Sequence, residues 1–234
     1  MYVERASRVP GAVAWTGTGA PDGTTRVLPD GCMDLLLWNG RLVIAGPDSR
    51  PHVFAGTPGD RVTGLRFAPG TAPPLLGVPA HELRDRRVPL SDLWPAAEVR
   101  PLEERAAAAR DPARVLEEAA ARRAGPREED PVRAEVVRLL RGGSGVTRAA
   151  RAVGLSERQL RRRSLDAFGY GPKTLARVLR MQRAVTLAGQ GVALAEVAAR
   201  TGYADQAHLA RDVRALTGVP ASSFSPPAPR RGRP

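Results

Sequence analysis

Two stretches near the C-terminal end of the chain share one pattern: 146-VTRAARAVGLSERQLRR-162 and 194-LAEVAARTGYADQAHLARDVRALTGV-219. In each, an alanine-rich run is followed by a glycine, Gly154 or Gly202, and then by a residue that can cap a helix, Ser156 or Asp205. The second glycine follows the first by 48 residues, so the pattern is a repeat. It predicts two helix-turn-helix units, with second helices over residues 157–168 and 205–216.

A longer helix is expected between the two units. Pro172 suits the first turn of a helix, and apolar positions continue to about residue 188, where Gly189 and Gly191 end the pattern. A helix over residues 173–188 would be about 24 Å long at roughly 1.5 Å per residue. With the width of each unit added, the two second helices would lie about 34 Å apart, which is one turn of B-DNA.

Positive charge is concentrated in the C-terminal part of the chain, whose formal net charge is +12. Residues 1–126 contain 16 arginines and 15 acidic residues, a net charge of +1, whereas residues 127–234 contain 19 arginines and one lysine against 9 acidic residues, a net charge of +11. A GC-rich genome explains the preference for arginine over lysine, but it does not explain this asymmetry. A basic module beside a near-neutral one predicts binding to a polyanion such as DNA.

The N-terminal part is predicted to be rich in β-structure. Residues 35–38 and 41–45 are apolar runs on either side of Asn39-Gly40, a pair that favours a type I′ turn between antiparallel strands. Residues 53–55 and 62–67 are further predicted strands. No apolar run approaches the roughly 20 residues that a membrane span needs, so we expect no membrane association and a cytoplasmic location.

These patterns predict an α+β chain with two domains. Residues 1–95 are expected to form a β-rich sensor or dimerisation domain, either reduced cupin-like or a half-barrel, since about 90 residues is short for a full double-stranded barrel. Residues 96–126, which are dense in helix formers, are expected to be a helical linker. Residues 127–224 should form an all-α DNA-binding domain, and the Pro- and Arg-rich residues 225–234 a disordered tail.

The C-terminal domain resembles the DNA-binding domain of the AraC/XylS family of bacterial transcriptional regulators. The resemblance covers about residues 130–224 and rests on the two stretches quoted above and on GPKTLARVLRMQRA at residues 171–184. The most specific signal is Ala-x-x-x-Gly-Tyr-x-Asp-Gln-x-His-Leu, followed by Arg211 and Gly218. The segments at residues 28–47 and 64–94 resemble the N-terminal domain of a subgroup of these regulators, whose ligand is undefined.

The resemblance implies which side chains face DNA, because in that family the second helix of each unit enters the major groove. The implied base-facing residues are Arg158, Arg161 and Arg162 in the first unit and Gln206, Ala207, His208 and Arg211 in the second. Arginine reads guanine and glutamine reads adenine through paired hydrogen bonds, whereas alanine offers only a methyl group. The side chains expected to contact phosphates, because the long helix passes the DNA backbone, are Lys173, Arg177 and Arg180.

Some of these side chains have a second interpretation. His208 packs or caps in one interpretation and reads a base in the other, because histidine serves both purposes. Three further arginines could contact DNA or could simply lie on solvated helix faces; these are Arg163, Arg183 and Arg214.

The sequence departs from the family pattern at three places. Ser164 stands where the family has a large apolar residue, and Leu209 and Val213 stand where it has aromatic residues. The C-terminal proline of the family is displaced, with Pro220-Ala221 here. These departures are expected to soften the packing of the core, above all in the first unit, and to leave the groove-facing surface intact.

The N-terminal part offers no convincing catalytic or metal site. The spacing of Cys32, Asp34, His52 and His81 matches no metal-binding motif, and a structural role is favoured for all four. The three tryptophans are expected to pack in the core rather than line a pocket; they are Trp15, Trp38 and Trp94. No Ser-His-Asp arrangement and no phosphate-binding loop is present, so we expect neither enzymatic activity nor a cofactor.

The sequence therefore predicts a sequence-specific transcriptional regulator that binds double-stranded DNA. A small-molecule effector and a second copy of the chain are candidate partners of the N-terminal domain, and RNA polymerase is a candidate partner of the regulator. Two alternatives stay open: a nonspecific nucleoid-type binder, favoured by the high pI, and a DNA-alkylation-repair regulator using Cys32. The four-cysteine zinc cluster of such repair proteins is absent, because Cys32 is the only cysteine.

Overall fold

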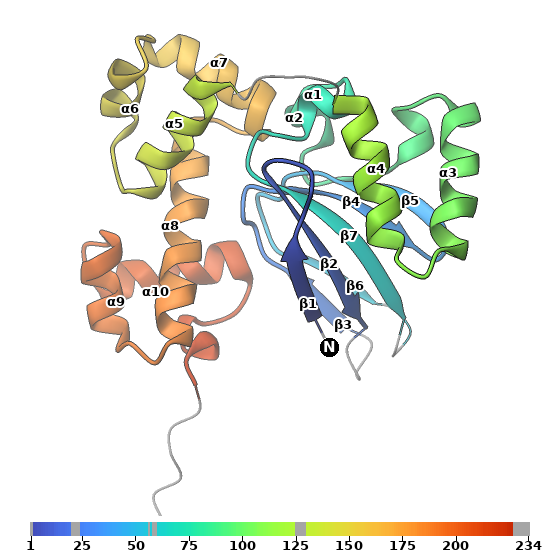
Figure 1. The fold of residues 1–234 in the computed structure, drawn as a ribbon. Coiled ribbons are helices and arrows are strands. Elements are labelled where there is room, and N and C mark those ends of the chain that lie inside the picture. The colour runs from blue at the N-terminus through green and yellow to red at the C-terminus, as the bar shows by residue number, and fades with distance from the viewer. Residues whose placement is uncertain (1, 20–23, 56, 58–59, 125–129, 227–234) are drawn as a thin grey trace, which may run out of the picture.

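A computed structural model describes residues 2–19, 24–55, 57, 60–124 and 130–226. Strands β1 to β7 precede the helices along the chain, as the N-terminal turn signals and the C-terminal helical pattern predict, and β8 follows the first two short helices (Figure 1). The strands are β1 (Tyr2–Ala6), β2 (Ala12–Thr18), β3 (Thr24–Val27), β4 (Met33–Trp38), β5 (Arg41–Ala45), β6 (His52–Ala55), β7 (Arg61–Phe67) and β8 (Arg87–Pro89). The expected domain boundary near residues 125–126 and the tail from residue 227 onward lie outside the described residues.

The strands form an open antiparallel sheet with the order β1-β2-β7-β4-β5-β8, and β3 pairs with β6 in a separate two-stranded sheet. The hairpin between β4 and β5 confirms the prediction from Asn39-Gly40. Trp38 pairs with Arg41, and both turn residues have positive φ, 48° at Asn39 and 73° at Gly40, as a type I′ turn requires. The α+β fold class is confirmed.

One face of the sheet carries the N-terminal core. Along β4 every second side chain is buried, among them Leu35 and Leu37, so the strand presents one apolar face to the interior. Helices cover this core and the ends of the sheet: α1 (Pro73–Leu76), α2 (Ala80–Leu83), the 3-10 turn η1 (Leu90–Asp92), α3 (Ala96–Ala108) and α4 (Pro112–Ala124).

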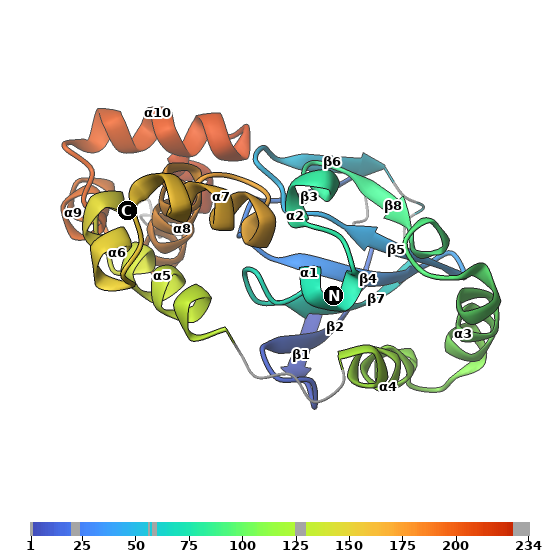
Figure 2. The same cartoon turned by 90° about the horizontal axis from the view of Figure 1, so that it is seen from above.

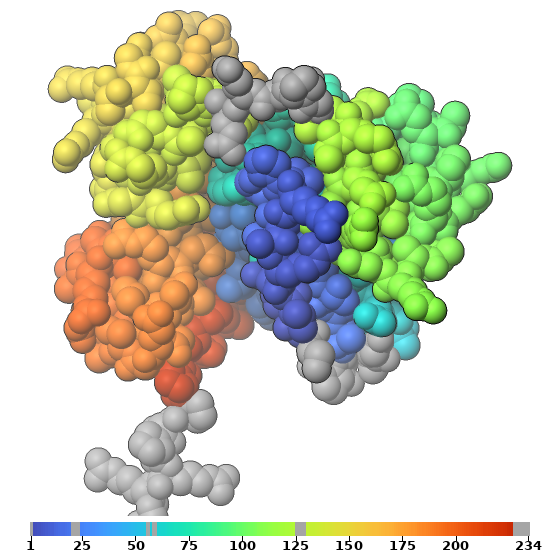
Figure 3. Space-filling view, viewed as in Figure 1, coloured from blue at the N-terminus to red at the C-terminus, as the bar shows by residue number. Residues whose placement is uncertain are grey.

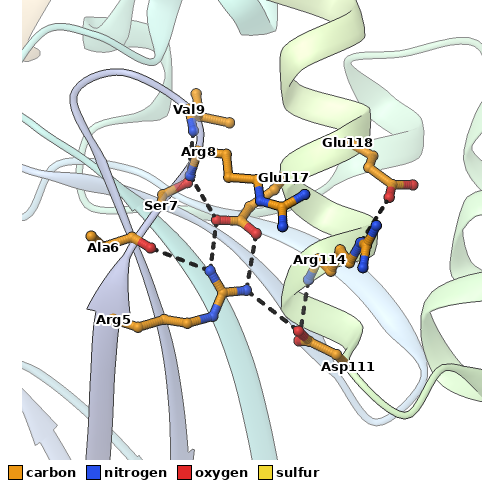
Figure 4. A network of polar contacts seen from close by, with 9 residues as sticks. All are labelled: Arg5, Ala6, Ser7, Arg8, Val9, Asp111, Arg114, Glu117 and Glu118. Atoms are coloured by element: carbon orange, nitrogen blue, oxygen red, sulfur yellow. Dashed lines mark hydrogen bonds and ion pairs between the residues drawn. The ribbon is translucent and has the colours of Figure 1, made fainter.

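Helices α3 and α4 belong to the N-terminal core, which corrects the expectation of a linker over residues 96–126. Leu102 of α3 and Leu116 of α4 are buried in the same cluster as Leu35 of the sheet. An ion pair adds a polar attachment: the guanidinium of Arg5, at the end of β1, donates to both carboxylate oxygens of Glu117, at 2.9 Å each (Figure 4). The apolar face of each helix packs against the sheet. Helix-forming propensity predicts that a helix forms, but it does not predict which element its apolar face will contact.

The C-terminal domain is entirely helical and has a core of its own. Its elements are α5 (Pro131–Arg141), α6 (Val146–Ala152), α7 (Glu157–Phe168), α8 (Pro172–Gly189), α9 (Leu194–Thr201), α10 (Gln206–Thr217) and the 3-10 turn η2 (Ala221–Phe224). Figure 3 shows the first three helices (yellow) and the last helices (orange) as two lobes on one side of the N-terminal domain. Helix α8 runs from one lobe to the other (Figure 1). Within the described residues, none of the helices has the length and hydropathy needed to cross a membrane.

The N-terminal domain contacts both lobes and the helix between them (Figure 2). His81 of α2 lies 3.5 Å from Asp166 of α7. In the middle, Gln182 of α8 donates to the carbonyl oxygen of Pro29 at 2.5 Å. At the far end, Arg26 of β3 donates to the carbonyl oxygen of Thr217, the last residue of α10. The two domains therefore meet along the length of the helical domain.

Candidate nucleic-acid interface

The first helix-turn-helix unit consists of α6 and α7, and α7 covers the predicted residues 157–168. Gly154 in the turn has a φ of 67°, a conformation that a side chain would strain. Ser156 and Gln159 form a capping box: the Ser156 hydroxyl accepts from the backbone N–H of Gln159, and the Gln159 side chain accepts from that of Ser156. These local contacts fix where α7 begins.

Helix α7 has one buried face and one basic face. Leu160 and Phe168 are buried on the first face. Arg158, Arg161 and Arg162 are exposed, and their spacing of three and four residues places them together on the opposite side. No described residue forms an ion pair with any of these three arginines, so the basic face is available to an anion.

The second unit repeats this design with different residues. Gly202 ends α9 with a φ of 78°, and the Asp205 side chain caps α10 by accepting from the backbone N–H of His208 at 2.6 Å. Gln206, Ala207 and Arg211 are exposed on α10, while Leu209 and Val213 face the core. The helix begins at Gln206, with Asp205 as its cap, and ends at Thr217.

His208 is placed differently from its neighbours on α10. Its ring meets Tyr203 edge-on with 5.1 Å between the ring centroids, and its Nδ1 accepts from the backbone N–H of Ala204 at 3.4 Å. The side chain is half-buried. These contacts favour the packing interpretation of His208 over base reading.

A buried carboxylate organises the junction between α8 and α10. Asp212 is 8% exposed and accepts from Arg177, from Arg180 at 3.2 Å and from the Tyr203 hydroxyl at 3.0 Å. The guanidinium of Arg180 also lies 4.2 Å from the centroid of the Tyr203 ring. Burial alone would raise the pKa of Asp212, but the hydrogen bonds from Arg177 and Tyr203 lower it below its usual range.

This network changes the interpretation of two expected phosphate contacts. Arg177 and Arg180 are attached to Asp212 rather than free, because a carboxylate buried between helices needs positive partners. Lys173, near the start of α8, is exposed. Sequence reasoning missed Asp212, since an aspartate in the middle of an amphipathic helix gives no local sign of burial.

The other basic residues also divide into two groups. Arg183 donates to the carbonyl oxygens of Arg141 at 3.0 Å and Arg200 at 3.2 Å, near the ends of α5 and α9, so it joins three helices instead of being only solvated. Arg163 and Arg214 are exposed.

The departures from the family pattern affect the two units unequally. Leu209 and Val213 are each 1% exposed, and Ala221 of η2 is buried beside them, so the second unit is well packed. Ser164 is fully buried, and its hydroxyl has no hydrogen-bond partner among the residues that the structure describes.

The N-terminal candidates are not brought together into a metal site. No cluster of three potential metal ligands occurs among the described residues. Asp34 accepts from Trp15 Nε1 at 2.6 Å and lies 3.6 Å from the Arg66 guanidinium. His81 instead faces Asp166 in the other domain.

The tryptophans have different neighbours. Trp38 packs against Phe54 with 5.6 Å between ring centroids, whereas Trp94 is 5% exposed with the guanidinium of Arg123 above it. Trp38 and Trp94 therefore each pack against neighbours of their own.

Comparison with known proteins matches two family models. A helix-turn-helix domain family matches residues 149–225, and a domain of unknown function (DUF6597) matches residues 12–89. No curated protein matches the chain.

Solved structures of ToxT from Vibrio cholerae are similar in arrangement at low identity. An apo form of a single-residue ToxT variant from strain SCE256 is 9% identical with a TM-score of 0.48, over 94% of this chain and 98% of that chain. ToxT of strain O395 is 8% identical with a TM-score of 0.45, over 95% of each chain.

The matched helix-turn-helix domain agrees with the DNA-binding domain that the sequence predicts in the C-terminal part of the chain. Both domains predicted by resemblance are matched, in the predicted order. The chain thus carries an AraC-type helix-turn-helix domain after an N-terminal DUF6597 domain, a combination that supports a DNA-binding transcription regulator.

Proposed function

We propose that α7 and α10 enter two adjacent major grooves on one face of a DNA duplex and read its sequence. The observation that carries this proposal is the division of each helix into a buried core face and an exposed polar face. Helix α8 has 18 residues, about 27 Å at roughly 1.5 Å per residue, a length that supports a spacing near one turn of DNA.

The two helices are proposed to read different bases. Arg158, Arg161 and Arg162 of α7 would favour guanine, since a guanidinium can donate two hydrogen bonds to the edge of that base. Gln206 of α10 would favour adenine and Arg211 guanine. Ala207 would offer a methyl contact, and His208 would contribute through its packing on Tyr203.

Phosphate contacts are proposed for Lys173 and, in part, Arg177. Lys173 is exposed without an ion pair to any described residue. The Arg177 side chain is 42% exposed although it is attached to Asp212, which leaves part of its guanidinium accessible to a phosphate. Arg180 is 30% exposed and stacked on Tyr203, so we assign it to positioning.

Regulation is proposed to come from the N-terminal domain, through a small-molecule effector or through dimerisation. The core shared by the sheet, α3 and α4 supports a domain that extends through residue 124. It contacts both helix-turn-helix units, so a change in its position would alter their relative placement. The regulator would act in the cytoplasm on the nucleoid, with RNA polymerase as the candidate partner at the promoter.

Alkylation repair through Cys32 is disfavoured by the chemistry of the thiol. Burial, together with the carboxylates of Asp30 and Asp34, raises the pKa of Cys32 well above its usual value. The thiolate is the reactive form, so this environment suppresses the nucleophile.

Selection of duplexes from a random pool by the full chain tests the proposal. Two conserved blocks about one turn apart are expected in the selected duplexes. Arg161→Ala and Arg211→Ala should each weaken binding by about 5- to 150-fold, equivalent to ~1–3 kcal/mol, and relax selection in different blocks. Arg100→Ala, at an exposed arginine of α3, is the matched control and should change neither block. Equal affinity for random duplex would instead support the nonspecific binder and refute base reading.

A further inference from the structure

A pocket of about 440 Å³ lies where the first helix-turn-helix unit meets the N-terminal domain. Its walls come from α1 and the loop after it, on the N-terminal side, and from α5 and α7. Most of the lining is apolar, including Val78, Val132, Val136, Leu155, Leu160 and Phe168. A volume of this size falls in the range of small-molecule sites, roughly 300–1,000 Å³.

The pocket contains a buried hydroxyl that lacks a partner. Ser164 of α7 lines it, is 0% exposed and forms no hydrogen bond within the described residues. Two buried threonine hydroxyls in the same domain pair within their own helices: Thr201 donates to the carbonyl of Val197, and Thr217 to that of Val213. A buried polar group without a partner costs free energy, so the site is better satisfied with a ligand that supplies one.

The open space is particular to the first unit. Ser164 lies one helical turn from both Leu160 and Phe168 on the core face of α7. The residue in the same place on α10 is Val213, one turn after Leu209, and the apolar contact around these two leaves no space for a water molecule (about 0 Å³). The small side chain of Ser164 thus leaves room that the larger one fills in the second unit.

The charged side chains that line the pocket have a formal net charge of zero. The pocket is lined by two arginines, Arg133 and Arg163, and by two aspartates. Asp130 accepts from backbone N–H groups at the start of α5, and Asp166 lies 3.5 Å from His81. A formal balance of charge around an apolar wall favours an uncharged occupant.

We propose that this pocket binds an uncharged, mostly apolar small molecule with one hydrogen-bonding group, which pairs with the Ser164 hydroxyl. The occupant would touch α1 on one side and α5 and α7 on the other. Its binding would thereby alter how the first helix-turn-helix unit sits against the N-terminal domain, a coupling that rests on the DNA-binding function proposed above. The second unit, which lies outside the pocket, would be affected less.

The test uses the full chain and N-phenyl-1-naphthylamine, an uncharged fluorophore that brightens in apolar surroundings. Saturable binding to the wild-type chain is expected, measured without DNA. Ser164→Leu fills the pocket from α7 and Val78→Trp fills it from the N-terminal side, so each should weaken binding at least tenfold. The matched controls are Ser222→Leu and Val3→Trp, at exposed positions outside the pocket, which should bind the probe as the wild type does.

The two variants place the added side chain in different domains, so loss of folding in one does not affect the result for the other. A thermal melt of each variant checks that it is folded. Unsaturable binding by the wild type, or unchanged binding by both folded variants, would overturn the site. The coupling is measured separately: saturating probe should change the affinity of the wild type, but not of Ser164→Leu, for a selected duplex. A saturable, Ser164-dependent probe site in a chain that selects no DNA sequence would leave the pocket intact and refute the proposed function.

Discussion

Replacement of Asp212 by alanine tests whether one buried carboxylate holds the second helix-turn-helix unit together. The change removes the shared acceptor of Arg177, Arg180 and Tyr203. It leaves the Tyr203 hydroxyl, whose residue is 5% exposed, without this partner. It also leaves two neighbouring guanidinium groups facing each other without the negative charge between them.

The expected loss follows from the exposure of each partner. Breaking a fully buried ion pair by removing one member costs about 3–5 kcal/mol. Here the arginine side chains are 42% and 30% exposed, so water recovers part of the interaction and the estimate falls to about 2–3 kcal/mol. The pKa of Asp212 is lowered in the folded chain, so this stabilisation is present at neutral pH and is lost as the pH falls through that lowered pKa.

Urea denaturation of the full chain measures the loss, and binding to a selected duplex measures its consequence. Asp212→Ala should unfold at lower urea and lose contacts mainly in the block read by α10. Glu196→Ala is the matched control, because Glu196 forms an exposed pair with Arg200 on α9 and its loss should be small. A loss below about 0.5 kcal/mol, comparable to that control, would refute the claim that Asp212 organises the junction.

Two further predictions concern stability. Burial raises the pKa of Asp34 from its ordinary 3.8 to about 6, so the folded chain holds a proton that the unfolded chain releases, and stability should fall as the pH rises from about 4 to 6. Asp34→Asn keeps an acceptor for Trp15 and should reduce this decline in thermal melts, leaving the part that comes from the raised pKa of Asp30; an unchanged pH profile would contradict the assignment. Ser156→Ala removes the cap of α7 and should cost about 1 kcal/mol in urea denaturation, whereas Ser156→Gly should cost only a few tenths, and equal losses would argue against a capping role.

The sequence by itself determined the elements whose signals are local. The caps Ser156 and Asp205 and the glycines Gly154 and Gly202 lie within a few residues of the helices they begin or end, so α7 occupies the predicted residues. Asn39-Gly40 specified its hairpin for the same reason, since the turn needs two residues that accept positive φ. The excess of arginine in residues 127–234 predicted that the C-terminal domain binds a polyanion, because net charge depends on composition alone.

Only the tertiary structure decided which of the polar side chains are free. The arginines of α7 stay exposed, whereas Arg177 and Arg180 pair with Asp212, which lies 35 and 32 residues away in sequence. Arg5 reaches Glu117 across 112 residues, and that pairing helps attach α4 to the sheet instead of leaving it as a linker. Such partners meet only when the apolar faces of distant elements pack, and a periodic pattern marks a face as buried without naming what will cover it.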